Sequence, residues 1–336
     1  MAPIVPMVLM ANGNINSLPP QLIIIINHRC NFQCRYCPTI RDFSKINYDI
    51  AIISVDFFLK IAPDNCLIKF SGGEPLMNFA LLRDIIIFAR KKAEILHKKI
   101  QFQLTTNGSL LNNKIIDFLK TNRDIELIIS LDGDRDTQLR NRITKNKKES
   151  FDTIILNRHK LFSSYPGRVT INMVIAPNTA EVFYNNFIYV LKLGFNRFNF
   201  LPAYFIYWDK NKIKLLKNNF YKIARFILGN RNKMDIYIRN LDFTNTVPLF
   251  NAGLVVDCNG DIFTNNLFLA KYFAPFRKQL KIGSVRSLPF IKTHFPGLAN
   301  IRQIIKEGVS KPIFDSTMAV DKVLTSFVRY LKNEKS

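Results

Sequence analysis

The chain has 336 residues, of which 48% are hydrophobic, and its 48 Lys and Arg against 25 Asp and Glu give a formal net charge of +23. This length allows one large or two ordinary domains, and the apolar content is ample for a packed core. The charge favours nucleic acid, acidic peptides or membrane surfaces as partners, although a generally lysine-rich composition explains it equally well. Because the basic residues are spread along the chain, with no block interleaved with aromatics, nucleic-acid binding is disfavoured.

Five cysteines, three of them within eight residues, do not make a disulfide framework and indicate a reducing compartment. The apolar start contains Pro3 and Pro6 and lacks a basic segment, so we expect no signal peptide. No apolar run reaches the roughly 18 residues that a spanning helix needs. These features predict a cytoplasmic protein without a membrane partner.

Apolar, β-branched runs alternate with stretches of helical spacing after a lead-in at residues 1–20. We predict strands at 22–26, 67–70, 100–105, 125–130, 168–175 and 195–201. We predict helices at 49–61, 81–96, 113–121, 151–161, 179–193 and 210–228. Strands that alternate with helices indicate parallel βα units. These units define a predicted core at residues 21–235.

The pattern changes from about residue 236. A short strand is predicted at 235–238, and two apolar runs flank Asn259-Gly260, which is a strong hairpin signal. A further apolar run lies at 280–285, and 320–332 has the spacing of a closing amphipathic helix. We therefore expect a C-terminal α+β domain over residues 236–336.

Three cysteines, Cys30, Cys34 and Cys37, closely follow the first strand. Three thiolates this close repel each other unless a cation neutralises them, so a metal centre is expected. A structural zinc site needs four protein ligands, and no fourth Cys or His stands at the required spacing. A [4Fe–4S] cluster is held by thiolates and can leave one iron open for a ligand, which fits three cysteines better. Buried free cysteines and a partial zinc site are the alternatives.

This C-x3-C-x2-C spacing, with Tyr36 just before the last cysteine, resembles the radical SAM enzymes. The resemblance implies that the open iron binds S-adenosyl-L-methionine (SAM), and that a reductant such as flavodoxin or ferredoxin supplies the electron that cleaves it to a 5′-deoxyadenosyl radical. The implied fold is an open, partial (β/α)6 barrel of the TIM type. Active sites of such barrels lie at the carboxyl ends of the strands, where the polar and glycine-rich motifs of this chain fall.

The second strand runs into Gly72-Gly73-Glu74-Pro75. Paired glycines let a backbone approach a ligand closely, and Glu74 can accept a hydrogen bond from an ammonium group. In this position the turn resembles the GGE motif of the same family. The resemblance implies that Gly72, Gly73 and Glu74 hold the amino group of the SAM methionine.

The third strand ends at Asn107 and the fourth at Ser130, in stretches that resemble the TNG and S-x-DG signatures of one radical SAM branch. That branch includes sulfatase maturases and peptide-modifying enzymes with SPASM or twitch extensions. By this resemblance Tyr36, Asn107, Ser130 and Arg142 bind the cofactor. A guanidinium suits the SAM carboxylate, although Arg142 is equally well interpreted as a solvated surface residue.

Two further residues near these signatures have open roles. Asp132 is expected to bind substrate or to cap the next helix. Asn172, on the fifth strand, is a candidate to face the nucleoside.

The segment 253–263 resembles the hairpin of a SPASM or twitch domain, in which cysteines hold auxiliary [4Fe–4S] clusters. Here Thr264-Asn265-Asn266 stands where such a cysteine is expected, and only Cys258 is present. One thiolate does not hold a cluster, so we expect a single cluster in the protein. The C-terminal domain is then expected to serve as a substrate lid or a peptide-docking surface.

The remaining candidate residues lie outside these motifs. Cys258 is a candidate hydrogen-atom donor, because a thiol near the radical could quench a substrate radical, as in peptide epimerases of this superfamily. Cys66 is expected to be a small buried hydrophobe, and His28 a loop residue beside the cluster. Tyr204 and Trp208 are expected to pack within a loop, with lining of the substrate mouth as the alternative.

The resemblance implies an enzyme that abstracts hydrogen from a residue of a peptide or protein, leading to an epimer, a crosslink or an oxidised residue. The basic composition would suit an acidic leader peptide. One alternative is a radical SAM dehydrogenase or mutase of a small molecule. Another is a non-catalytic metal- or nucleic-acid-binding protein.

Overall fold

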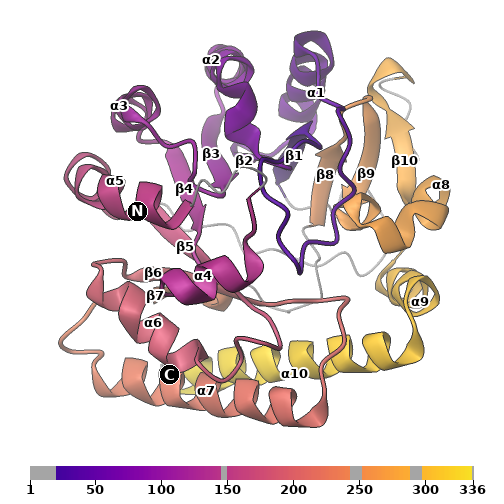
Figure 1. The fold of residues 1–336 in the computed structure, drawn as a ribbon. Coiled ribbons are helices and arrows are strands. Elements are labelled where there is room, and N and C mark those ends of the chain that lie inside the picture. Colours follow the sequence, from indigo (N-terminus) through magenta and orange to yellow (C-terminus); the bar gives the residue numbers. More distant parts are fainter. Residues whose placement is uncertain (1–19, 145–149, 243–251, 288–296, 335–336) are drawn as a thin grey trace.

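The computed structural model describes residues 20–144, 150–242, 252–287 and 297–334. A single sheet curves through the molecule in the order β10-β9-β8-β1-β2-β3-β4-β5-β6-β7, with helices outside it (Figure 1). Its strands are β1 (Gln21–Asn27), β2 (Asn65–Gly72), β3 (Lys99–Thr106), β4 (Ile125–Ser130), β5 (Val169–Ile175), β6 (Arg197–Pro202), β7 (Tyr237–Ile238), β8 (Ala252–Val256), β9 (Asp261–Asn265) and β10 (Lys281–Ser284). The α-helices are α1 (Tyr48–Ile61), α2 (Phe79–Ile95), α3 (Asn113–Thr121), α4 (Arg135–Asn141), α5 (Ser150–Ser164), α6 (Phe183–Lys192), α7 (Lys210–Gly229), α8 (Arg277–Leu280), α9 (Leu298–Gly308) and α10 (Lys311–Asn333).

Strands β1 to β7 are parallel, and helices connect β1 through β7 in succession, so the predicted open barrel is confirmed. All seven residues of β1 are buried, because the sheet is covered on both faces at its centre. The short segment predicted at 235–238 forms β7 and extends the parallel sheet at its far edge.

The C-terminal strands continue the same sheet. β8 pairs in parallel with β1, with Leu22 opposite Leu254, and β9 and β10 follow in antiparallel order. Gly260, at φ +87°, closes the predicted hairpin between β8 and β9. The C-terminal segment is thus bonded directly to the first barrel strand, although the domain boundary at residue 236 stays a prediction.

Several helices differ from the sequence prediction: the four-residue α8 was not predicted, and α6 begins four residues after its predicted start at 179. α10 begins at Lys311, nine residues before the predicted start, because Ser310 is its N-cap and a proline occupies its first turn. α4 and α9 are absent from the prediction, and α4 has only seven residues with one apolar side chain, too few for a periodic signal. The predicted lead-in, apart from residue 20, lies outside the described residues. None of the helices in the described ranges is long and apolar enough to cross a membrane.

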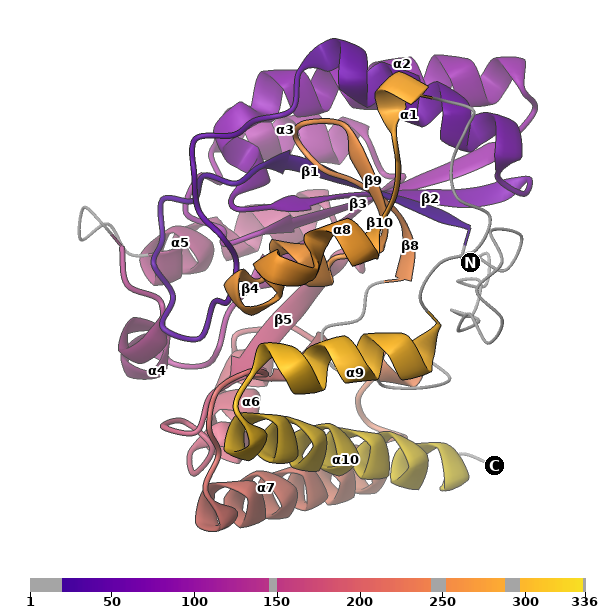
Figure 2. The same cartoon turned by 90° about the vertical axis from the view of Figure 1, so that its right-hand side faces the viewer.

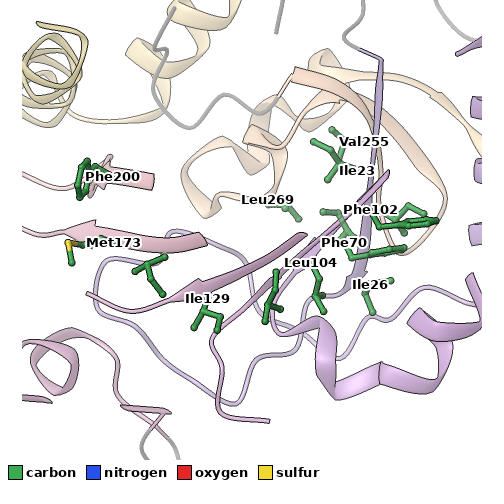
Figure 3. Close-up of a cluster of buried hydrophobic side chains, with 14 of the residues drawn as sticks. Ile23, Ile26, Phe70, Phe102, Leu104, Ile129, Met173, Phe200, Val255 and Leu269 are labelled. Carbon is green, nitrogen blue, oxygen red and sulfur yellow. The ribbon is translucent and has the colours of Figure 1, made fainter. Parts of the chain in front are cut away.

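Apolar side chains fill the molecule on both faces of the sheet. Figure 3 shows buried residues of the sheet, among them Phe70 and Phe102, whose rings stack with centroids 6.1 Å apart. On the other side of the barrel, α7 and α10 run side by side (Figures 1 and 2). The ring centroids of Phe220 on α7 and Phe327 on α10 lie 4.7 Å apart. This packing fixes the strand ends from which the polar loops project.

Candidate active site

The three motif cysteines lie on the loop between β1 and α1, and all three line one cavity of about 230 Å³. The cavity opens at the carboxyl ends of the parallel strands, because its walls include Ser71 of β2, Thr105 of β3 and Ser130 of β4. The thiols are free and partly buried. The structure therefore brings together the motifs that the sequence places at separate strand ends.

The donor set around the cavity fits a multi-iron group better than a single ion. Sulfurs bound to one zinc ion lie about 3.8 Å apart, since each is about 2.3 Å from the metal. Cys30, Cys34 and Cys37 are not among the described groups whose ligand atoms all lie within 4.8 Å of one another. No His or further Cys of the described ranges lines the cavity. Three separated thiols around one space are what a cluster held by thiolates requires.

The environment of the three thiols differs from one to the next. Burial raises the pKa of Cys34 to about 11, although the neighbouring Arg142 favours the thiolate, and burial also raises the pKa of Cys30. Burial alone would also raise the pKa of Cys37, but hydrogen bonds from Thr39 and Arg41 lower that pKa below its usual value. Metal binding would therefore release protons, and a bound cation is what stabilises all three thiolates together.

Backbone hydrogen bonds hold the cysteine loop from two sides. From the end of α4, the carbonyls of Ile143 and Asn141 accept from Gln33 N and Arg35 N, at 2.7 and 2.8 Å. The peptide groups that follow Cys37 pair with the segment 269–271, where Ile40 N donates to the Leu269 carbonyl at 2.7 Å. The loop geometry thus depends on both the barrel core and the C-terminal segment.

Gly72 and Gly73 line the cavity and also lie against the backbone of the cysteine loop. A Cβ on Gly73 would meet the carbonyl oxygen of Arg29 at 1.9 Å, and one on Gly72, at φ +125°, would meet the carbonyl oxygen of Asn27 at 2.3 Å. Only glycine fits such contacts. The two glycines are therefore needed where the end of β2 lies beside the end of β1, whatever they bind in the cavity.

The Glu74 carboxylate is fully buried and does not line the cavity. It accepts hydrogen bonds from Thr106 Oγ1 at 2.8 Å, from Asn107 N at 2.7 Å and from Leu76 N at 3.0 Å. Burial raises its pKa to about 7 in spite of these donors. Its cofactor contact stays a prediction, and the structure shows a carboxylate that fixes the turn carrying Asn107.

Asn107 borders the cavity beside the first cysteine. Its Nδ2 donates to Asn31 Oδ1 at 2.9 Å and lies 3.9 Å from Cys30 Sγ. Its Oδ1 accepts from the hydroxyl of Ser109 at 2.6 Å. The Asn107 side chain is thus held in place next to the cysteine loop.

Arg142 is 5% exposed and lines the cavity, so the interpretation as a solvated surface residue is wrong. It donates from Nε and Nη2 to the two oxygens of Asp132, at 3.0 and 2.9 Å. Tyr36 donates to the same carboxylate at 2.6 Å, and the guanidinium lies 5.5 Å from the Tyr36 ring centre. Asp132 therefore neither caps α4, whose N-cap is Asp134, nor lines the cavity; it orients Arg142 and Tyr36.

A second part of the cavity lining, which we call the apolar wall, is largely apolar. It consists of Val174, Leu201, Pro202 and Ala203, from the ends of β5 and β6, together with Tyr204. Tyr204 was expected only to pack in its loop, and the alternative of lining the cavity is the one observed.

The loop after β6 shows how this wall is held. The Tyr204 hydroxyl donates to Asp321 of α10 at 3.1 Å, and burial raises the pKa of Asp321 to about 7. Trp208 is buried as expected and donates from Nε1 to the Ala203 carbonyl at 2.8 Å. Beneath the wall, Asn172 accepts a hydrogen bond from Asn199 at 2.6 Å, so its nucleoside contact remains a prediction.

Cys258 and Cys66 lie away from the cavity lining. The Cys258 thiol donates to the Ile25 carbonyl at 3.4 Å and is 6% exposed, a position that gives no support to the predicted hydrogen-atom donor. Cys66 is 5% exposed at the start of β2, in agreement with a small buried hydrophobe.

His28 joins the cysteine loop to the C-terminal hairpin. Its Nε2 lies 2.7 Å from Asp257 Oδ1 and its Nδ1 3.1 Å from Asp42 Oδ2. Burial disfavours the imidazolium, but the bonds to Asp257, Cys258 and Asp42 raise the pKa of His28 to about 11. This link was not predictable, because 229 residues separate His28 from Asp257.

The model of the Radical SAM superfamily matches residues 24–183. These residues therefore form a Radical SAM domain, and proteins of that superfamily use a [4Fe–4S] cluster and SAM. Over 227 residues it is 28% identical to an uncharacterized protein of Methanocaldococcus jannaschii, covering 66% of this chain and 74% of that protein.

Two other relatives carry functional names. The chain is 28% identical to a cysteine-type anaerobic sulfatase-maturating enzyme of Clostridium novyi and 23% identical to the radical SAM cyclopropyl synthase TigE of Paramaledivibacter caminithermalis. The matches cover 54% and 49% of this chain, but only 50% and 37% of the two enzymes. The chain thus spans about half the length, or less, of these relatives.

Solved structures share the fold at low sequence identity. Native anSMEcpe with bound AdoMet has a TM-score of 0.73 at 16% identity, covering 94% of this chain and 100% of its own. Streptococcus suis SuiB bound to the precursor peptide SuiA has a TM-score of 0.54 at 14% identity, covering 75% of this chain and 60% of its own. The partial barrel with a C-terminal extension is therefore the fold of SPASM- and twitch-type radical SAM enzymes.

Proposed function

We propose that the chain binds one [4Fe–4S] cluster through Cys30, Cys34 and Cys37, cleaves SAM, and modifies a residue of a peptide or protein. The observation that carries this proposal is the convergence of three free thiols and Arg142 on one cavity at the strand ends. When bound, such a cluster supplies the electron that cleaves SAM, and the resulting 5′-deoxyadenosyl radical abstracts hydrogen from a substrate C–H bond.

The residues of the polar wall have distinct tasks in this proposal. Arg142, oriented by Asp132 and Tyr36, offers its remaining guanidinium donors to a carboxylate in the cavity. Ser130 offers a hydroxyl, and the backbone of Gly72 and Gly73 also borders the cavity, with the Gly73 N–H donating to the Asn27 carbonyl at 2.7 Å. Together they provide the complementary groups for the carboxylate, amino and ribose parts of SAM.

A peptide or protein substrate is supported by the named relatives. A sulfatase-maturating enzyme and a precursor-peptide complex are among the proteins that share sequence or fold with this chain. The wall formed by Val174, Leu201 and Pro202 suits an aliphatic group, which is what a side chain of a substrate residue presents. A reductant protein such as flavodoxin or ferredoxin would deliver the electron.

The test is anaerobic reconstitution followed by two measurements: iron and sulfide per chain, and 5′-deoxyadenosine formed from SAM with a strong reductant. We expect about four irons per chain and nucleoside formation. The Cys30/Cys34/Cys37→Ala triple variant is expected to lose both. The Cys66→Ala/Cys258→Ala double variant is the matched control and is expected to keep both.

Two outcomes would contradict the proposal. About eight irons per chain would mean that a second cluster is bound through ligands outside the cavity described above. Nucleoside formation that survives in the triple variant would mean that the reaction does not depend on these cysteines.

A further inference from the structure

The charged residues of helix α7 are all basic. Its 20 residues include six cations and no Asp or Glu; the cations are Lys210, Lys212, Lys214, Lys217, Lys222 and Arg225. Every other described α-helix of more than ten residues carries at least one acidic residue. The shorter helices α6 and α8 also lack acidic residues, and the N-cap of α7 is Asp209, so the segregation distinguishes α7 among the longer helices.

Most of this charge falls on one side of the helix. At 100° per residue, Lys210, Lys214, Lys217, Tyr221 and Arg225 lie within about 80° of the helix circumference. All five are exposed, and we call them the α7 basic face. Within the described residues, none of its four cations forms an ion pair. At 1.5 Å per residue the face is about 22 Å long.

The four cations of the α7 basic face are not among the residues that pack the helix against the rest of the protein. The opposite side of α7 is buried through Phe220, Ile223 and Ile227, and α10 runs beside it (Figures 1 and 2). Tyr221 is 55% exposed, and its ring lies 6.2 Å from that of Tyr330 on α10. The face is therefore an ordered strip of charge whose substitution should leave the fold intact.

The start of the α7 basic face lies close to the cavity along the chain. β6 ends in the apolar wall, Tyr204 still lines the cavity, and Lys210 begins α7 six residues later. Tyr207, which is 60% exposed, lies between them. Because α7 follows the carboxyl end of β6, its N-terminal end is on the side of the molecule where the cavity opens.

We propose that the α7 basic face docks an acidic segment of the peptide substrate, and that residues next to this segment enter the cavity. The inference rests on the proposed function and adds the substrate class, a peptide with clustered Asp or Glu near the modified residue. An extended segment rises about 3.3 Å per residue, so about seven residues cover the face. Nucleic acid fits less well, because one tyrosine among four cations offers little stacking for bases.

The test measures binding of two fluorescein-labelled probes by anisotropy: a Glu-rich peptide about seven residues long and a single-stranded oligonucleotide of the same charge. In the test variant Lys210, Lys214, Lys217 and Arg225 are replaced by Gln. The control variant replaces four exposed lysines on α2, α3 and the start of β3, namely Lys91, Lys99, Lys114 and Lys120, also by Gln. The two variants have the same net charge, so a difference between them reports position.

We expect the test variant to bind the peptide about tenfold more weakly than the native protein, and the control to change by less than about twofold. Equal losses in both variants would overturn the proposal, since binding would then follow net charge alone. Tighter binding of the oligonucleotide than of the peptide, lost in the test variant, would also overturn it in favour of a nucleic-acid surface.

The proposal can fail separately from the proposed function. 5′-Deoxyadenosine formed without substrate is expected to be unchanged in the α7 variant, because none of its residues lines the cavity. If the native protein forms no nucleoside, the proposed function fails while the binding result stands. If nucleoside formation is normal but the α7 variant binds the peptide like the native protein, only the docking proposal fails.

Discussion

The two walls of the cavity are built in different ways. On the polar wall, Arg142 and Tyr36 are each bonded to Asp132 behind them, so their positions are fixed before anything binds. On the apolar wall, Val174 and Leu201 are placed by strand packing, and α10 holds the one hydroxyl, that of Tyr204. In the proposed function the first wall would bind SAM with little rearrangement, and the second would contact the substrate.

The largest expected effect comes from the close contact beneath the polar wall. In Gly73→Ala the new Cβ would overlap the Arg29 carbonyl, so the cysteine loop must move. We expect a loss of more than about 4 kcal/mol in the free energy of unfolding, measured with urea, together with loss of iron binding. Gly229→Ala, which meets nothing within 4 Å, is the control and should change stability by about 1 kcal/mol or less. A stable Gly73→Ala protein with a full cluster would contradict this account.

The buried ion pair of the polar wall gives the next effect. Asp132→Asn leaves the Arg142 guanidinium without its charged partner, and we expect a loss of about 3–5 kcal/mol in unfolding free energy. Asp124→Asn breaks a pair of similar geometry with Arg90, in which both side chains are about a third exposed, and should cost less than about 1 kcal/mol. Equal losses, measured by urea unfolding, would show that burial does not distinguish the two pairs.

The carboxyl group of Asp321, which holds the Tyr204 hydroxyl at the apolar wall, should make stability depend on pH. Burial raises the pKa of Asp321 from 3.8 to about 7, so the folded protein binds a proton that the unfolded chain has lost between these values. The contribution of Asp321 to the free energy of unfolding should therefore fall as pH rises from about 4 to about 7, by roughly 3–4 kcal/mol, and then level off. In Asp321→Asn this contribution should vanish. Urea unfolding of both proteins at several pH values tests it, and parallel curves would refute it.

The smallest expected effect is a change in the KM for SAM, which should differ between substitutions in the two walls. Ser130→Ala removes one hydroxyl from the polar wall and should raise the KM for SAM about fivefold, the value of one hydrogen bond. Leu201→Ala truncates the apolar wall and should leave that KM within about twofold. Both are measured as 5′-deoxyadenosine formation without substrate. An equal rise in the two variants would mean that SAM contacts both walls.

Much of the fold follows from the sequence because its signals are local. The β-branched runs and their turns predicted all six principal strands, and Asn259-Gly260 predicted the β8–β9 hairpin. Short helices such as α4 were not predicted, because seven residues are too few to show a helical periodicity. The pairing of β8 with β1 was not predicted either, because strand order depends on contacts between distant parts of the chain.

The candidate site could be predicted as a set of residues, but not as a set of contacts. The spacing of Cys30, Cys34 and Cys37 indicated a shared centre, and the structure gathers them at one cavity. Nothing local showed that Asp132 would bond Arg142 and Tyr36, or that Glu74 would turn toward Asn107. The alignment of the α7 basic face follows from the helix predicted at 210–228, whereas the exposure of its side chains comes only from the structure.

The link from His28 to Asp257 has a consequence for how the protein is made. On the ribosome the cysteine loop emerges early, while its partner Asp257 follows 229 residues later and Arg277, 2.7 Å from Asp257, later still. The loop therefore lacks these restraints until most of the chain has been translated. A chain truncated before β8 would lack the bond between His28 and Asp257, and the cysteine loop would then be held from the side of α4 alone.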